Sequence, residues 1–101
     1  MALWKVLMEN KAEEELTKLL KDKIITKSDI KVLLRWVSEM EEFGPKYIES
    51  SSEWHDHVLD REWIGYRSSA FSSTGRVIYK IIDDQIVVHV ARVTADHNYK
   101  K

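Results

Sequence analysis

Residues 86–93 constrain the fold of this chain more than any other stretch of its sequence. They read Ile-Val-Val-His-Val-Ala-Arg-Val, so nearly every residue favours β-structure. Such a nearly continuous apolar run is typical of a strand inside a sheet, where other elements cover it on two sides. We therefore expect a central strand over 86–94, with the rest of the chain packed around it.

Three shorter segments predict the strands that join this central strand. Residues 3–8 are short and apolar. Residues 64–71 and 76–82 are rich in β-forming side chains, and turn-forming residues follow each of them. The last three strands can form an antiparallel meander, and the first must join the same sheet. Alternation along the first strand places Trp4, Val6 and Met8 on the same face.

Two amphipathic segments predict a pair of helices joined by a short connection, which favours an antiparallel hairpin. The first begins at Asn10, with Glu13 as its capping-box partner, and ends near residue 22. The second begins at Thr26, with Asp29 as the partner, and ends at the glycine and proline of positions 44–45. The apolar stripe of the second helix consists of Ile30, Leu33, Leu34, Val37, Met40 and Phe43.

The order strand, helix, helix, then three strands predicts an α+β fold, in which the helix hairpin packs on a mostly antiparallel four-stranded sheet. Residues 47–61 are polar and predict an irregular segment with a short turn near Trp54. The length suits one domain, spanning residues 1–101.

Composition narrows the class of protein. The chain has no cysteine, which excludes a disulfide framework and a thiolate metal site. No apolar run approaches the roughly 20 residues of a membrane helix, and residues 1–5 have no long apolar stretch. We therefore expect no secretory leader and a cytoplasmic protein without a membrane partner. Residues 1–60 carry a net charge of −4 and residues 61–101 carry +3. The basic part suits a phosphate-bearing partner, although so small an excess is also ordinary scatter.

Two motifs in the second half carry a family resemblance. Residues 56–67 read DHVLDREWIGYR, which resembles the DHxL…WxGYR segment of YafQ-type ribonucleases. Residues 76–81 read RVIYKI, which is similar to a strand that many RelE-like toxins share. The tail over 92–99 is similar to the last strand of the same group, which ends in Arg or His followed by an aromatic residue. The chain thus resembles the RelE/ParE superfamily of bacterial toxins, with the order of elements matching from end to end.

This resemblance implies a toxin of a type II toxin–antitoxin module that cleaves messenger RNA, usually on the ribosome, and that a cognate antitoxin holds inactive. It implies chemistry without a metal or other cofactor. A base takes the proton of the ribose 2′-hydroxyl, which attacks the adjacent phosphate, while cations stabilise the phosphorane and an acid protonates the leaving 5′-oxygen.

The resemblance also implies which residues act. His57 and His97 match histidines of the YafQ-type pattern and would transfer protons, for which imidazole suits neutral pH. Arg76 and Arg92 match arginines that would hold the phosphate. Each also has a purely structural reading, as a loop histidine, a tail residue or a strand arginine. Further RNA contacts are expected from Arg67, Tyr99, Lys100 and Lys101.

The chain departs from the pattern at two positions. Ala70 and Thr74 stand where the YafQ-like pattern has a second histidine and an aspartate, so the catalytic set is thinner than in its relatives. A different class of function therefore stays open, that of a non-enzymatic ParE-like toxin that binds and inhibits a partner such as DNA gyrase. A metal site at His55 and His57 would need a third ligand that no spacing fixes.

Overall fold

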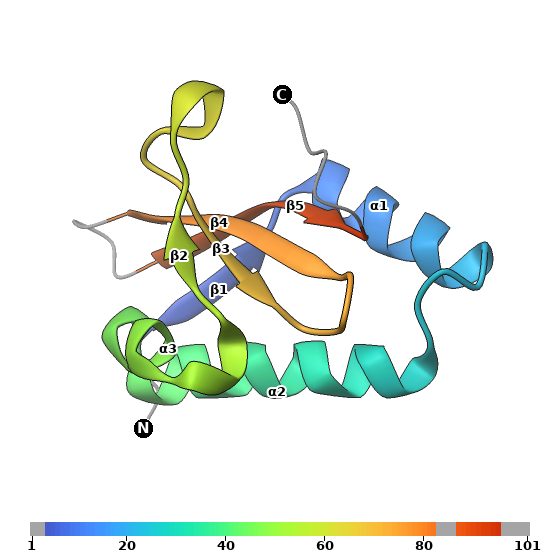
Figure 1. Ribbon diagram of the computed structural model, residues 1–101, viewed down its shortest axis with the longest axis horizontal. Helices are drawn as coiled ribbons and strands as arrows, with labels where there is room; N and C mark the ends of the chain where they lie inside the picture. The colour runs from blue at the N-terminus through green and yellow to red at the C-terminus, as the bar shows by residue number, and fades with distance from the viewer. Residues whose placement is uncertain (1–3, 83–86, 96–101) are drawn as a thin grey trace.

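A computed structural model gives the structure of the 101-residue protein and describes residues 4–82 and 87–95. Three helices lie against one mixed sheet, so the predicted α+β class is confirmed (Figure 1). The helices are α1 (Asn10–Lys21), α2 (Lys27–Phe43) and α3 (Pro45–Ser50). The strands are β1 (Lys5–Met8), β2 (His57–Val58), β3 (Arg67–Ala70), β4 (Arg76–Ile82) and β5 (Val87–Thr94). Two 3-10 turns are η1 (Ser52–Trp54) and η2 (Arg61–Trp63).

The sheet has five strands in the order β1-β5-β4-β3-β2, one more than predicted, because the short β2 adds to its edge. Strand β1 runs parallel to β5, and every other pairing is antiparallel. The predicted central strand is confirmed, since β5 has a neighbour on each side. A register irregularity after Ile78 shifts the β4–β5 pairing, with Ile78 opposite Arg92 and Tyr79 opposite Val90.

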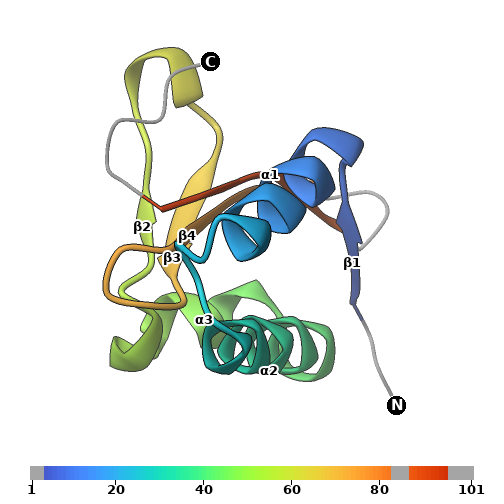
Figure 2. The same cartoon turned by 90° about the vertical axis from the view of Figure 1, so that its right-hand side faces the viewer.

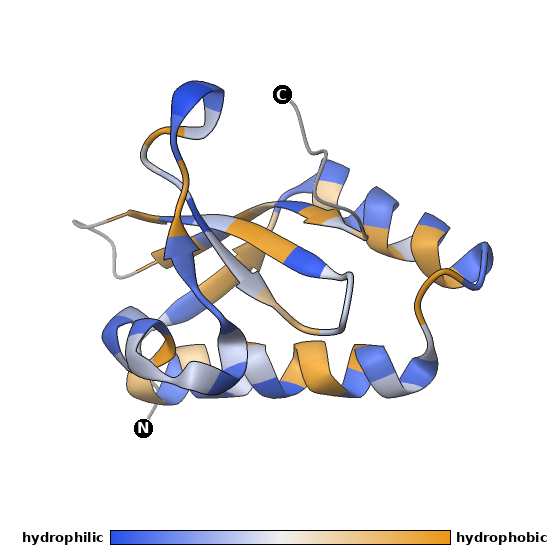
Figure 3. Cartoon of the chain, viewed as in Figure 1, coloured by the Kyte–Doolittle hydropathy of each residue, from blue (hydrophilic) through white to orange (hydrophobic). Residues whose placement is uncertain are grey.

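The main hydrophobic core joins both long helices to one face of the central strands. Val77 and Tyr79 of β4 and Val88 of β5 belong to the same buried cluster as Ala12 of α1 and Trp36 of α2. Figure 1 shows the two helices running in opposite directions, and Figure 2 shows α2 lying beneath α1 beside the sheet. In Figure 3, an orange hydrophobic stretch follows the blue hydrophilic start of β4.

The two predicted helix starts had different outcomes. Thr26 accepts a hydrogen bond from the Asp29 backbone and Asp29 accepts one from the Thr26 backbone, so this capping box is confirmed. The predicted box at Asn10 is wrong. Asn10 is the first residue inside α1, and Glu9 precedes the helix without a side-chain cap. The Glu9 backbone N–H instead donates to Val90 of β5, so sheet pairing fixes this helix start.

The apolar stripe of α2 is rotated from the predicted one. Leu34 and Phe43 are 59% and 53% exposed, whereas Trp36, outside the predicted stripe, is fully buried. The Trp36 ring lies edge-on to Tyr79, with ring centroids 5.3 Å apart. Helical spacing predicts a stripe, but the shape of the sheet beneath it decides which edge of the stripe is covered.

The segment after α2 is more ordered than its polar sequence indicates. Gly44 ends α2 at a φ of 88°, and a Cβ there would lie 2.6 Å from the Trp4 ring nitrogen. Pro45 then begins α3 instead of only stopping α2, because proline fits the first position of a helix. The predicted turn near Trp54 is confirmed. The strand predicted over 64–71 begins only at Arg67, since η2 precedes it.

Glu15 of α1 completes the edge of β5 where β1 has ended. The β1 pairing stops at Met8 opposite Val90, and the next part of β5 meets α1. Glu15 accepts from the Val93 backbone N–H at 3.1 Å and from Arg92 Nε at 2.8 and 2.9 Å. The hydrogen bond with Glu15 raises the pKa of the Arg92 guanidinium above its ordinary value. No described helix is long and apolar enough to cross a membrane.

We predict that Glu15→Ala lowers the free energy of unfolding by about 2–3 kcal/mol, because a backbone donor and a mostly buried guanidinium lose their shared acceptor. Urea unfolding followed by circular dichroism measures the change. Glu14→Ala, on the exposed side of the same helix, is the matched control. Equal stability of the two variants would contradict a role for Glu15 in fastening α1 to β5.

Candidate active site

A pocket of about 670 Å³ opens where β4 begins, beside α2 and the segment that leads into β2. We call it the His57 pocket. In Figure 1 the chain that follows α3 passes in front of α2 before it rises to β2. Two of the four predicted catalytic residues, His57 and Arg76, lie in this pocket. Its lining is Val32, Arg35, Glu53, Trp54, His55, His57, Ala70, Phe71, Ser72, Ser73 and Arg76.

Arg76 is the buried cation of the pocket. It is 8% exposed, and its Nε donates to the Ser68 hydroxyl at 2.5 Å. Its Nη2 donates to the backbone carbonyls of Ser68 at 3.3 Å and His55 at 3.0 Å, and lies 3.3 Å from His57 Nδ1. Because Ser68 is itself fully buried, the guanidinium is held from β3 and aimed at the segment that carries the histidines.

The His57 ring is exposed and has two partners for the same nitrogen. Nδ1 lies 3.3 Å from Arg76 Nη2 and 3.4 Å from the His55 carbonyl oxygen. When Nδ1 carries no proton it accepts from Arg76, and when it is protonated it donates to the carbonyl. In the second tautomer Nε2 is unprotonated, which is the form that a general base needs.

Asp56 fastens this segment to the sheet. Its side chain is fully buried, and it accepts from Arg67 Nε at 2.7 Å and from the hydroxyls of Ser69 and Tyr79 at 2.5 Å each. These donors come from β3 and β4, so one carboxylate joins two strands to the residue beside His57. A buried carboxylate is stable only with such a set of donors.

The same carboxylate changes the acid–base behaviour of its neighbours. Burial raises the pKa of the Tyr79 hydroxyl well above its ordinary value, and the negative charge of Asp56 raises it further. Burial lowers the pKa of the Arg67 guanidinium, but the hydrogen bond and charge of Asp56 outweigh burial, so that pKa is raised. Tyr79 therefore stays a hydrogen-bond donor to Asp56 across the physiological range.

The other predicted site residues lie elsewhere or outside the described residues. Arg67 pairs with Asp56 and lies 3.7 Å from Glu49. Arg92 is opposite Ile78 in the sheet, and its guanidinium pairs with Glu15 of α1. Their predicted roles toward RNA stay predictions. The calls that fall outside the described residues are His97, Tyr99, Lys100 and Lys101.

The sequence reading missed the residues that hold the site together. In the sequence Asp56 stands out only as part of the DHxL motif, and Tyr79 only as part of the RVIYKI strand. A signal was available, because Tyr79 and Arg67 fall on neighbouring strands and an acidic residue beside a catalytic histidine needs a donor. The serines of β3 gave no signal of their own. They are Ser68 and Ser69, both fully buried.

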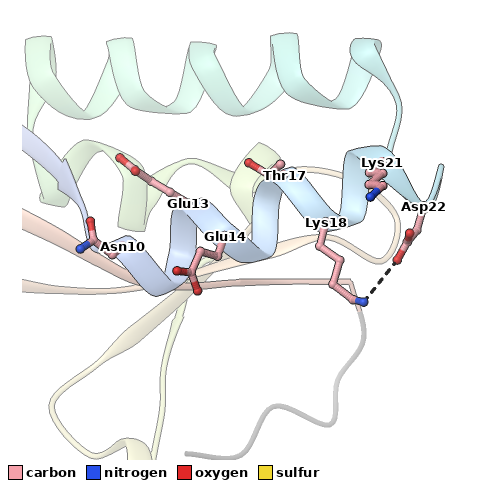
Figure 4. Close-up of a pocket in the computed structure, with 7 residues that line it drawn as sticks. All are labelled: Asn10, Glu13, Glu14, Thr17, Lys18, Lys21 and Asp22. Carbon is pink, nitrogen blue, oxygen red and sulfur yellow. Dashed lines mark ion pairs between the residues drawn. The ribbon is translucent and has the colours of Figure 1, made fainter.

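Asp56 does not supply the third ligand that a metal site at His55 and His57 would need, because its carboxylate accepts hydrogen bonds from Ser69 and Tyr79. Among residues 4–82 and 87–95, no three histidine or acidic side chains are arranged to hold a metal ion. A second hollow lies along the exposed side of α1, where Figure 4 shows Lys18 paired with Asp22. Its lining comes from α1 and the residue after it and contains no predicted site residue.

Several solved structures have a fold similar to that of this chain. YafQ from E. coli superposes with a TM-score of 0.64 at 15% identity, over 91% of this chain and 92% of that one. A metal-bound toxin from Helicobacter pylori gives a TM-score of 0.70 at 18% identity, over 94% and 96%. The RelBE2 toxin–antitoxin complex from Mycobacterium tuberculosis gives 0.56 at 26% identity, over 91% and 96%. The chain has the RelE/ParE-like toxin fold.

This fold was the one expected from the motifs of residues 56–67 and 76–81, and that expectation is confirmed. No known protein-family model and no curated protein matches the sequence. The RelE/ParE-like fold of this chain is thus evident in its structure at sequence identities too low to carry over a reaction.

We predict that Asp56→Asn lowers the free energy of unfolding by about 3 kcal/mol, because Arg67 and the two hydroxyls lose a buried negative acceptor. Chemical denaturation at neutral pH measures it. Asp60→Asn, an exposed change four residues along the chain, is expected to alter stability by less than about 0.5 kcal/mol. A similar small effect at Asp56 would show that the network does not fasten the segment.

We predict a pH dependence from Tyr79. Below about pH 10 the hydroxyl is protonated in both folded and unfolded chains. Above it the unfolded chain releases this proton and the folded chain keeps it, so stability falls by up to about 1.4 kcal/mol per pH unit. Tyr79→Phe should lack this part of the alkaline slope. Tyr47→Phe, at an exposed tyrosine, should keep the wild-type slope in urea titrations. Parallel slopes for wild type and Tyr79→Phe would contradict the raised pKa.

Proposed function

We propose that the chain is the toxin of a type II toxin–antitoxin module and acts as a metal-independent endoribonuclease that cleaves messenger RNA on the ribosome. The observation that carries the proposal is that His57 and Arg76 line one open pocket, with His57 Nδ1 and Arg76 Nη2 3.3 Å apart. An imidazole and a fixed cation are what phosphodiester transfer through a ribose 2′-hydroxyl requires.

In this proposal His57 takes the proton from the 2′-hydroxyl as that oxygen attacks the adjacent phosphorus. Arg76 lies behind it and stabilises the charge that develops on the phosphorane oxygens. Arg76 needs little reorganisation for this role, since Ser68 and the His55 carbonyl already fix its guanidinium. A second group protonates the leaving 5′-oxygen, and the resemblance implies His97 as the other candidate for proton transfer.

The proposed partners follow from the same comparisons. Structures similar to this chain include the E. coli DinJ–YafQ complex and the RelBE2 complex, each of a toxin with its antitoxin. We therefore propose a cognate antitoxin that binds this chain, with messenger RNA and the ribosome as the target. The proposal needs no cofactor.

A second candidate function is a non-enzymatic ParE-like toxin that binds and inhibits a partner such as DNA gyrase. The pairing of Arg92 with Glu15 favours it, because a guanidinium held by a carboxylate is less available to a phosphate. Ala70, in the lining of the His57 pocket, also adds no ionisable group there.

The test is induced expression in bacteria without an antitoxin. We expect the wild type to arrest growth and to create new 5′ ends within translated messages. His57→Ala and the double change with His97→Ala should lose both effects, with the loss of His57 slowing cleavage about 10²–10⁴-fold. His89→Ala is the matched control, a histidine on β5 that is absent from the pocket lining.

Two outcomes would count against the nuclease. Growth arrest without new 5′ ends, equally strong in the His57 variant, would move the partner-binding toxin to first place. Growth unaffected by the wild type, in cells that accumulate folded protein, would contradict both candidates.

A further inference from the structure

His55 lies in the His57 pocket and has no role in the function proposed above. Its side chain is exposed, and it lines the same pocket as His57 and Arg76. We propose that His55 is a catalytic residue, the general acid that protonates the leaving 5′-oxygen, with His57 as the general base. This inference rests on the proposed ribonuclease function.

The backbone at His55 is strained in a way that suits a site. Its φ is 46° and ψ 46°, in the left-handed region that residues other than glycine seldom occupy. Such strain persists only where neighbouring contacts impose it, and it gathers at functional sites. Two contacts hold the backbone here. The His55 carbonyl accepts a hydrogen bond from Arg76, and the side chain of the next residue, Asp56, is fully buried.

The lining of the pocket leaves few alternatives for a proton donor among the described residues. Its ionisable groups are Arg35, Glu53, His55, His57 and Arg76. An arginine does not release a proton at neutral pH. Glu53 is paired with Arg35, whose guanidinium lies 5.0 Å from the centroid of the Trp54 ring. The two imidazoles are therefore the remaining candidates for proton transfer in this pocket.

One of the two tautomers of His57 fits the role of the base. Its Nδ1 lies 3.3 Å from Arg76 Nη2 and 3.4 Å from the His55 carbonyl oxygen, and a ring that donates to that carbonyl presents an unprotonated Nε2, the form of a base. The exposed imidazole of His55 is then the acid, in its protonated form.

The step balances with these two groups alone. The 2′-oxygen forms a bond to phosphorus while its proton moves to His57 Nε2, and the bond from phosphorus to the 5′-oxygen breaks. The imidazolium of His55 gives its proton to that oxygen. The products are a 2′,3′-cyclic phosphate and a free 5′-hydroxyl, with no oxidant, reductant or metal ion consumed.

The experiment compares His55→Asn with the wild type on a short synthetic message bound to ribosomes. Asparagine tolerates the left-handed backbone conformation of His55. The substitution therefore removes the imidazole while the backbone can keep its φ and ψ. Lys23→Asn is the matched control, since Lys23 is exposed and also has a positive φ, 60°. His57→Asn and His97→Asn are measured beside them.

The decisive probe is a second message in which sulfur replaces the bridging 5′-oxygen at the cut linkage. Thiolate leaves without protonation, so a lost acid no longer matters. We expect His55→Asn to cleave the normal message about 10²–10⁴-fold more slowly, to lose the fall in rate at high pH, and to regain most of the wild-type rate on the sulfur message. His57→Asn should stay slow on both.

Three results would overturn the assignment. They are an unchanged rate and pH profile for His55→Asn, equal slowing of His55→Asn on both messages, and rescue by sulfur of His97→Asn instead. A wild type that cuts neither message would contradict the ribonuclease proposal itself. That result differs from the three above, because each of them requires a wild type that cleaves.

Discussion

The buried carboxylate of Asp56 is the interaction on which the candidate site depends. It is the fully buried anion between β3, β4 and the segment that enters β2, and it gathers an arginine, a serine and a tyrosine from two strands. Without these donors a charge in that position would be costly to bury. With them, the peptide that carries His55 and His57 is fixed to β3 and β4.

Strand β4 serves the core and the site together. Tyr79 packs against Trp36 in the main core and donates its hydroxyl to Asp56, while Arg76 three residues earlier lines the His57 pocket. The two serines of β3 also have separate partners. Ser68 accepts a hydrogen bond from Arg76, and Ser69 donates one to Asp56. A single pair of strands thus sets the distance between the cation and the histidines, which helps to explain why small polar residues are buried there.

Much of the architecture was predictable because it rests on local signals. The β-forming run ending at Thr94, the capping box at Thr26 and the bounds of β4 are confirmed, since each is encoded by neighbouring residues. The motif over 56–67 also indicated the fold and drew attention to His57. The failures are at positions where distant parts of the chain meet. Asn10 is not a cap because β5 supplies the contact at that helix start, and Leu34 is exposed because the sheet covers a different edge of α2.

By itself the sequence determined the class of fold, the order of most elements and two members of the candidate site, His57 and Arg76. Periodicity, capping and turn chemistry act over a few residues and can be read from them directly. Only the tertiary structure decided what surrounds those two residues. The Asp56 network joins positions 11, 13 and 23 residues apart, and the Arg92–Glu15 pair joins positions 77 apart. Hydrogen bonds between such distant residues depend on strand register and helix placement, which no local pattern in the chain records.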